Sequence, residues 1–118
     1  DFQQGYRCTS CNKSRHEAKV DFLLRKKKIR FLKEFAFDEC RGGKYPLPFD
    51  FAIPLQEDCK LLIEVDGALH ELAAKRKNDA IKERFVESRD DLVLRRIDAS
   101  RDIQEQLDEI LEEFEDLM

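Results

Sequence analysis

The sequence predicts a mixed α/β fold in which one helix precedes three strands, followed by a second helix, a fourth strand and a last helix. Two observations carry this prediction. Apolar runs of strand length, separated by short polar or glycine-containing turns, follow one another between residues 29 and 66. Apolar residues with helical spacing precede these runs, and recur at 73–87 and at the carboxyl end. A chain of 118 residues is long enough for one domain with a single core.

The first helix is expected to begin at Ser14. Ser14 and Glu17 have the spacing of a capping box, in which the serine caps the helix and the glutamate at the third helical position reaches back. Glu17 is therefore a capping residue, a carboxylate that faces a site, or both. The helix runs into the basic residues 25–28, and its apolar cover is expected from Ala18, Val20, Phe22, Leu23 and Leu24.

Three strands are expected next, at 29–37, 49–53 and 60–66. In the first, Glu34 falls on the face opposite the apolar positions, where it is either a solvated residue or a carboxylate that supports the site. Gly42-Gly43 marks a loop over 38–44, and Pro46 and Pro48 stiffen the entry to the second strand. Strands joined by short turns pair antiparallel, so these three should form a meander.

The rest of the chain predicts a helix over 73–87, a strand over 91–97 and a last helix capped by Ser100. Because a strand reached through a helix pairs in parallel, the fourth strand should make the sheet mixed. In the second helix Ala80, Ile81 and Phe85 are expected to face inward, and Lys75, Arg76, Lys77, Lys82 and Arg84 largely outward. The apolar stripe of the last helix is formed by Ile103, Leu107, Ile110, Leu111, Phe114 and Leu117.

Charge is distributed unevenly along the chain. The formal net charge is −4, but residues 100–118 hold eight acidic residues and one basic residue. Residues 7–44 hold 12 basic and five acidic residues, a balance of +7. Such a basic half favours a polyanionic partner, although a charge run is often only a solvated helix face. No apolar run has the length of a membrane span, and no signal-peptide pattern opens the chain, so we expect a cytosolic protein without a membrane partner.

Cys8 and Cys11 have the spacing of a zinc knuckle, and a tetrahedral site would need two further ligands. We interpret residues 1–13 as the remnant of a zinc ribbon whose other half precedes Asp1, which makes the chain a fragment. An unliganded loop and a redox pair stay open as alternatives. Cys40 and Cys59 lack partners at ligand spacing, and a disulfide framework is not expected in a cytosolic chain.

Carboxylates lie inside the apolar runs of the second and third strands. Asp50, Glu64 and Asp66 would be costly in strands buried on both faces unless a cation or a proton compensates them. Strand alternation places Glu64 and Asp66 on one face, with Asp50 alongside on the neighbouring strand. The alternative interpretation, an exposed acidic cluster followed by a histidine in a turn, fits a buried strand pair poorly.

Such a cluster suits a hard cation. Carboxylates on rigid strands suit Mg²⁺, which takes oxygen ligands, keeps several waters and can activate a water for attack on a phosphodiester. His70, which follows the third strand after Gly67, can transfer protons near neutral pH.

These residues form part of a longer pattern that resembles the PD-(D/E)XK nuclease superfamily. More narrowly, the pattern is similar to the branch related to the very-short-patch repair endonuclease, which includes phage-type homing endonucleases with a Glu, Asp, His, Asp active-site signature. The resemblance covers residues 5 to about 100 and implies a restriction-endonuclease-like αβββαβ core, here with an extra C-terminal helix. The motifs that carry it are Cys8-x-x-Cys11, Ser14-x-x-Glu17, Glu34-x-x-Phe37, Cys40-Arg41, Pro46-Leu-Pro-Phe-Asp-Phe51, Ile63-Glu-x-Asp-Gly-x-x-His70, Asn78-Asp79-x-x-Lys82 and Leu94-Arg-Arg-Ile97.

The resemblance assigns metal-binding roles to two strand residues. Asp50 matches the strand aspartate that is the central metal ligand, and Glu64 matches the acidic position of the (D/E)xK element, so both are expected to hold Mg²⁺ or Mn²⁺. Asp66 stands where that element has its lysine, which agrees with the branch that relies on a histidine. Lys82 either contacts phosphate or substitutes for the missing lysine, but we favour a surface lysine.

The resemblance assigns the remaining catalytic roles to Glu17, His70 and Asp79, as the helix-one glutamate, the catalytic histidine and the final aspartate on the second helix. The expected function is a metal-dependent endonuclease domain over 14–118 that cleaves double-stranded DNA, as a homing endonuclease in a bacterial or phage-infected cell and as a homodimer if both strands are cut. The basic first helix, the Gly42-Gly43 loop and the second helix would approach the DNA backbone. The alternatives are a repair or restriction nicking enzyme, a non-catalytic DNA-binding module on a decayed nuclease fold, or a structural domain that binds a partner through the acidic last helix.

Overall fold

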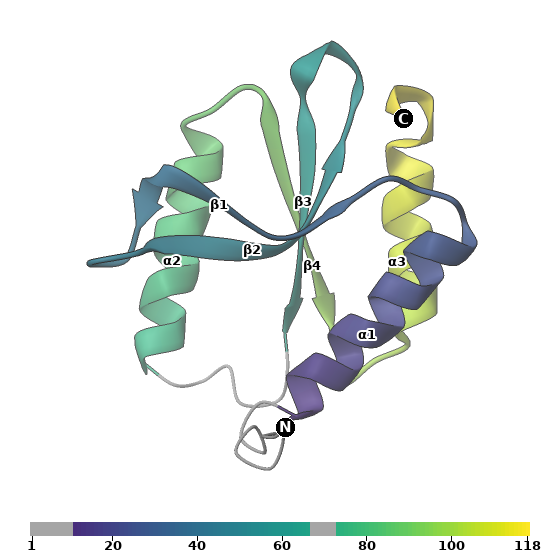
Figure 1. Ribbon diagram of the computed structural model, residues 1–118, viewed down its shortest axis with the longest axis horizontal. Helices are drawn as coiled ribbons and strands as arrows, with labels where there is room; N and C mark the ends of the chain where they lie inside the picture. The colour runs from purple at the N-terminus through teal and green to yellow at the C-terminus, as the bar shows by residue number, and fades with distance from the viewer. Residues whose placement is uncertain (1–10, 67–72) are drawn as a thin grey trace, which may run out of the picture.

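The computed structural model of the protein describes residues 11–66 and 73–118. It confirms the α/β fold and the expected order of elements (Figure 1). The elements are α1 (Cys11–Lys26), β1 (Leu32–Arg41), β2 (Pro46–Pro54), the 3₁₀ turn η2 (Gln56–Asp58), β3 (Lys60–Asp66), α2 (Ala73–Glu87), β4 (Leu92–Asp98), α3 (Ile103–Glu113) and the 3₁₀ turn η3 (Glu115–Leu117).

The four strands form one mixed sheet in the order β1-β2-β3-β4. β2 pairs antiparallel with both β1 and β3, as expected of a meander. β4 pairs parallel with β3, in a register that joins Lys60 to Leu92 and Asp66 to Asp98. Parallel strands need a crossover connection, and α2 provides it by carrying the chain from the end of β3 back to the start of β4.

Helices cover both faces of the sheet, as the apolar character of β2 and β3 predicts. On one face α1 and α3 pack against the sheet, and the core there includes Leu24, Phe51, Ile63 and Leu107. On the other face α2 covers a smaller core that includes Phe49, Leu62 and Val86. Figure 1 shows this division, with α1 and α3 on one side of the sheet and α2 on the other.

The start of α1 and its exposed face differ from the expectation. The helix begins at Cys11, so Ser14 lies within the helix and does not cap it. Ala18 and Phe22 are exposed, and Phe22 retains 62% of its accessible surface. Spacing explains this result, because Val20, Leu23 and Leu24 lie on one face of the helix and Phe22 points away from it.

The first strand begins later and ends later than the alternation indicated. Lys28 has a left-handed backbone (φ 62°) and, with hydrogen bonds from its own N–H and that of Ile29, ends the first helix. Ile29 and Phe31 therefore pack against the core from a connection, and β1 starts at Leu32, where pairing with Ala52 begins. Residues 38–41, expected in a loop, belong to β1.

The later elements follow the expectation with a few exceptions. The bounds of β3 and α2 are as predicted, β4 is shifted by one residue, and β2 extends over 46–54 rather than 49–53. The cap of α3 is Asp102, whose carboxylate accepts a hydrogen bond from the Glu105 N–H, and not Ser100. Ala80 and Leu117 are exposed rather than inward. Among the helices described, none is both long and apolar enough to cross a membrane.

Candidate active site

The candidate site begins where regular pairing between β2 and β3 ends. The paired register runs from Pro54 and Lys60 to Phe51 and Ile63. Beyond it, two side chains take over the hydrogen bonds between the strands. The backbone N–H of Asp50 donates to Glu64 Oε2 at 2.9 Å, and the N–H of Val65 donates to Asp50 Oδ2 at 2.8 Å. The two carboxylates are thereby fixed to the backbone of each other's strands.

A change in β2 accompanies this exchange. Strict alternation would place Phe49 on the same face as Phe51 and Ile53, but Phe49 packs in the α2-side core together with Ala52. In β1, Glu34 lies opposite Asp50 in the register and has a left-handed backbone with φ 50°. Such a conformation is costly for a residue with a side chain, so the strands depart from regular geometry at the level of the site.

Lys82 from α2 completes the buried centre of the site. Its Nζ lies 2.8 Å from Glu64 Oε1, and 5.2 Å from the centre of the Phe49 ring. Lys82 is 7% exposed and Glu64 1% exposed, so the interpretation of Lys82 as a surface lysine is wrong. The helical spacing indicates that Lys82 is buried, because residues four apart share a helix face and Val86 is buried.

Burial governs the protonation of the central carboxylate. It raises the pKa of Glu64, and the nearby Asp50 carboxylate raises it further, whereas the ammonium group of Lys82 lowers it. Burial also raises the pKa of the Cys40 thiol, which lies in the same core beside Lys82 and Glu64. A buried carboxylate whose charged form is disfavoured needs a cation, and Lys82 supplies one.

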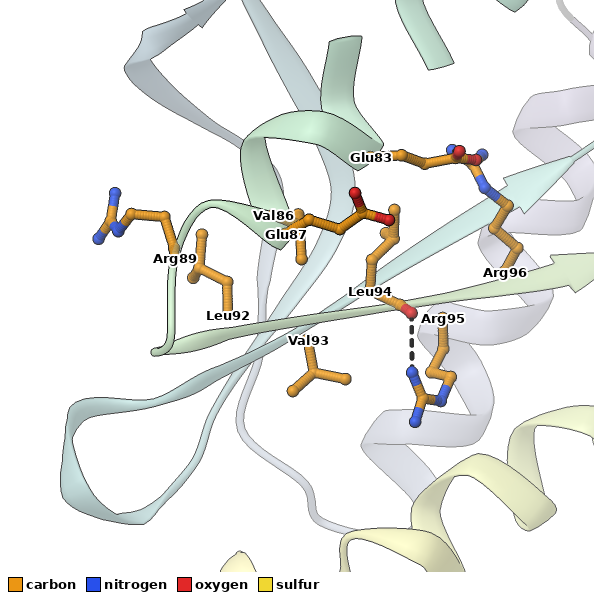
Figure 2. A pocket seen from close by; sticks show the side chains of 9 residues that line it. All are labelled: Glu83, Val86, Glu87, Arg89, Leu92, Val93, Leu94, Arg95 and Arg96. Atoms are coloured by element: carbon orange, nitrogen blue, oxygen red, sulfur yellow. Dashed lines mark hydrogen bonds and ion pairs between the residues drawn. The ribbon is translucent and has the colours of Figure 1, made fainter. Parts of the chain in front are cut away.

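Arg96 on β4 links three carboxylates next to this centre. Its Nη1 lies 3.5 Å from Asp66 Oδ1 and 3.6 Å from Asp79 Oδ1, and its Nη2 lies 3.2 Å from Glu83 Oε2. These carboxylates raise the pKa of Arg96 against the opposing effect of burial, which is the largest single influence on it. Figure 2 shows the guanidinium group of Arg96 meeting Glu83, at one end of a pocket lined by α2 and β4.

Arg96 had no role in the sequence-based assignment, although the sequence contains a signal for it. The parallel register places Arg96 directly beside Glu64. A basic residue in the strand that follows the acidic strand and its crossover helix is a natural partner for those carboxylates. The strand sequence alone does not show that register, because it follows from the crossover connection.

The structure brings most of the predicted site residues together. Asp50 and Glu64 bind one another's strands, Lys82 pairs with Glu64, and Arg96 joins Asp66 to Asp79. Glu64 pairs with Lys82 of α2. Arg96, which meets Asp66, also meets Asp79 and Glu83 of α2, so both carboxylates lie on the face that α2 covers.

The other predicted residues lie on α1, on β1 or outside the described chain. Glu17 is half-buried on the face of α1 that carries Val20, and Glu34 is exposed. His70 and Cys8 fall outside the described residues, as does the side chain of Cys11.

The donor set of the site suits a divalent cation. Asp50, Glu64, Asp66 and Asp79 carry four negative charges when ionised, against two positive charges from Lys82 and Arg96. In residues 11–66 and 73–118 no group of three or more histidine, cysteine, aspartate or glutamate side chains is placed to hold a metal ion. Mg²⁺ is commonly bound through one or two carboxylates and retains several waters, which matches the Asp50 and Glu64 pair.

Comparisons of the chain with protein-family models, with curated proteins and with solved structures find no match. The assignment of a function therefore depends on the residues of the site itself.

Proposed function

We propose that this chain is the catalytic domain of a metal-dependent DNA endonuclease that hydrolyses phosphodiester bonds in double-stranded DNA. The observation that carries the proposal is the buried pair of Asp50 and Glu64, held by two reciprocal hydrogen bonds on neighbouring strands with a lysine from a helix against one of them. A structural role alone gives no reason to bury two adjacent carboxylates with a single lysine, because their mutual repulsion and desolvation are costly.

The residues of the site divide the work as follows. Asp50 and Glu64 are the ligands for Mg²⁺ or Mn²⁺. When bound, the ion lowers the pKa of a water and neutralises charge on the phosphate. Lys82 holds the Glu64 carboxylate in place. The positive charge beside Glu64 thus comes from a lysine on α2, because position 66 is an aspartate. Glu64 is thus presented in one orientation.

Proton transfer is assigned to His70, as the base that accepts the proton of the attacking water or as the acid for the leaving oxygen. Glu17 and Asp79 would orient the histidine or a water, and Arg96 fixes Asp79 together with Asp66. The finer proposal is a homing endonuclease of the branch related to the very-short-patch repair endonuclease, in the cytoplasm of a bacterial or phage-infected cell. A zinc ion at Cys8 and Cys11 belongs to the same proposal.

Substitution of Asp50 or His70 by alanine tests the assignment. Asp50→Ala should remove Mg²⁺-dependent nicking of a supercoiled plasmid, because the central metal ligand is lost. His70→Ala should lower the rate by about 10²–10⁴-fold, the usual contribution of a general acid or base. The measurement is plasmid relaxation over time with Mg²⁺ and with EDTA, with circular dichroism to show that each variant is folded.

Glu109→Gln, on the exposed face of α3, is the matched control and should cleave at the parental rate. Undiminished nicking by Asp50→Ala would refute the assignment. A parental protein that shifts the plasmid in a gel without nicking it would favour the non-catalytic DNA-binding module instead.

A further inference from the structure

The exposed face of α1 carries a regular row of basic residues with an aromatic ring among them. Arg15, Lys19, Phe22 and Lys26 are spaced by four, three and four residues, so they lie on one face of the helix. All four are exposed. The row lies opposite the buried face formed by Val20, Leu23 and Leu24. We call these four residues the basic row of α1.

The basic residues of this row differ from their neighbours in their partners. Among the described residues, Arg15, Lys19 and Lys26 have no ion-pair partner. By contrast, Asp21 binds both Arg25 and Lys33, and Lys27 Nζ lies 3.0 Å from Asp108 Oδ1. The charge of the row is therefore available to an external anion, whereas that of the flanking residues is largely neutralised within the molecule.

Phe22 strengthens the case for a ligand. It retains 62% of its accessible surface, and it is not part of the hydrophobic core on the α1 side of the sheet. An exposed phenylalanine among basic residues can supply an apolar contact to the same ligand that the basic residues bind. The row thus combines three cationic groups with one apolar contact.

The length of the row fits a run of phosphates along one strand of a DNA duplex. From Arg15 to Lys26 the helix rises by about 16 Å, over which one strand of a DNA duplex carries about five phosphates. After the helix, Lys28 and Arg30 continue the positive charge and line a groove with Phe31 and Pro54. In Figure 1 the amino end of α1 lies at the same end of the molecule as the end of β3, which carries Asp66.

The neighbouring helix limits the surface on one side. α3 packs against α1, and residues 100–118 hold eight acidic residues and one basic residue. A polyanion on α1 is therefore repelled from α3 and directed to the opposite flank.

We propose that the basic row of α1 binds the phosphate backbone of the DNA duplex, with Phe22 contacting the apolar sugars and base edges. The inference rests on the proposed function for the identity of the polyanion. It predicts that the DNA backbone follows α1 from its amino end, which lies at the same end of the molecule as the end of β3. Apolar side chains placed among basic residues contact duplexes in this way when they enter the minor groove.

The salt dependence of binding tests the inference separately from cleavage. The parental protein and two triple variants are titrated into a fluorescent 30-base-pair duplex in EDTA, over a range of salt concentrations. One variant is Arg15→Gln/Lys19→Gln/Lys26→Gln. The control, Lys33→Gln/Lys60→Gln/Arg101→Gln, removes the same charge from positions outside α1, α2 and the Gly42-Gly43 loop.

Loss of three phosphate contacts should reduce the slope of log K against log salt by about 2.7 in the row variant. The control should change it by less than one phosphate contact. Phe22→Ala should weaken binding several-fold and leave the slope unchanged, because it removes an apolar contact and no charge.

Equal slopes for the two triple variants, or a parental slope in the row variant, would overturn the inference. Binding of the parental protein to phosphatidylserine vesicles but not to the duplex would overturn it in favour of a membrane surface, and binding to neither would exclude both. If the duplex binds with the expected slopes but the parental protein does not nick a plasmid in Mg²⁺, the inference about the basic row stands and the proposed function fails.

Discussion

Glu64 is the most buried acidic side chain that the structure describes. It is 1% exposed, it accepts a hydrogen bond from the Asp50 N–H, and it pairs with Lys82 at 2.8 Å. One lysine faces two carboxylates here, since Asp50 lies beside Glu64 and raises its pKa. Removing either member of such a buried pair typically costs about 3–5 kcal/mol, because the other charge is left uncompensated. The site therefore stays stable only while its charges are balanced.

The raised pKa of Glu64 predicts a pH dependence of stability in metal-free protein. The folded state holds the Glu64 proton more tightly than the unfolded chain, so this contribution is fully present below the ordinary value of 4.5. It is lost as the pH rises through the higher folded pKa. The free energy of unfolding of the parental protein should therefore fall relative to that of Glu64→Gln across this window.

Urea unfolding of both proteins in EDTA, from pH 4.5 to 7.5, measures this difference. Other titrating groups are common to the two proteins and cancel in the comparison. Parallel curves across the whole range would show that Glu64 ionises without cost and would remove the electrostatic basis of the site.

The ends of the helices and strands depend on tertiary contacts that the sequence pattern does not show. Ser100 precedes the last helix with the right chemistry for a cap, but its hydroxyl donates to Asp98 Oδ1 at 2.7 Å and the helix begins at Ile103. Asp102 takes the capping position instead. The two possible capping positions lie two residues apart, and the conformation of the turn after β4 selects Asp102. In this turn Gln106 also hydrogen-bonds the backbone N–H and carbonyl of Asp98.

Capping by Asp102 predicts a clear contrast between two substitutions. Asp102→Ala should lower the free energy of unfolding by about 0.5–2 kcal/mol, because the Glu105 N–H loses its acceptor. Ser100→Ala removes an exposed hydrogen bond and should stay within about 0.5 kcal/mol of the parental value. Chemical denaturation of the two variants measures both. A larger loss for Ser100→Ala would contradict the observed cap.

The whole molecule places the carboxylates where they can act together. The sheet order puts β2 and β3 in the middle, and helices on both faces bury them. The crossover through α2 then brings Lys82 over Glu64, and β4 brings Arg96 beside it. Four elements thus contribute to one site, although the chain separates Asp50 from Arg96 by 46 positions.

A cation that binds only the folded site should stabilise the whole domain. At Mg²⁺ or Mn²⁺ concentrations ten times the dissociation constant, linkage gives about 1.4 kcal/mol, which corresponds to a rise in Tm of roughly 5 °C for a domain of this size. Asp50→Asn should lose this rise, whatever its own starting Tm. Differential scanning calorimetry with and without the ion measures the shift, and an equal rise in both proteins would place the ion elsewhere.

The sequence by itself determined the order of elements, the mixed pairing of the sheet and the convergence of Asp50, Glu64 and Asp66. These features follow from local periodicity and from the connections, which short-range interactions and chain geometry control. It also indicated the charge asymmetry between the first helix and the last.

The tertiary structure decided the partners of those residues. Lys82 is one of several basic residues on α2, and its packing against Phe49 and its pairing with Glu64 show that it is buried. Phe22 reads as a core residue and is exposed, which leaves a basic row with an aromatic contact on α1. Whether a side chain meets a carboxylate or water depends on which elements pack together, and that depends on contacts between residues distant in the chain.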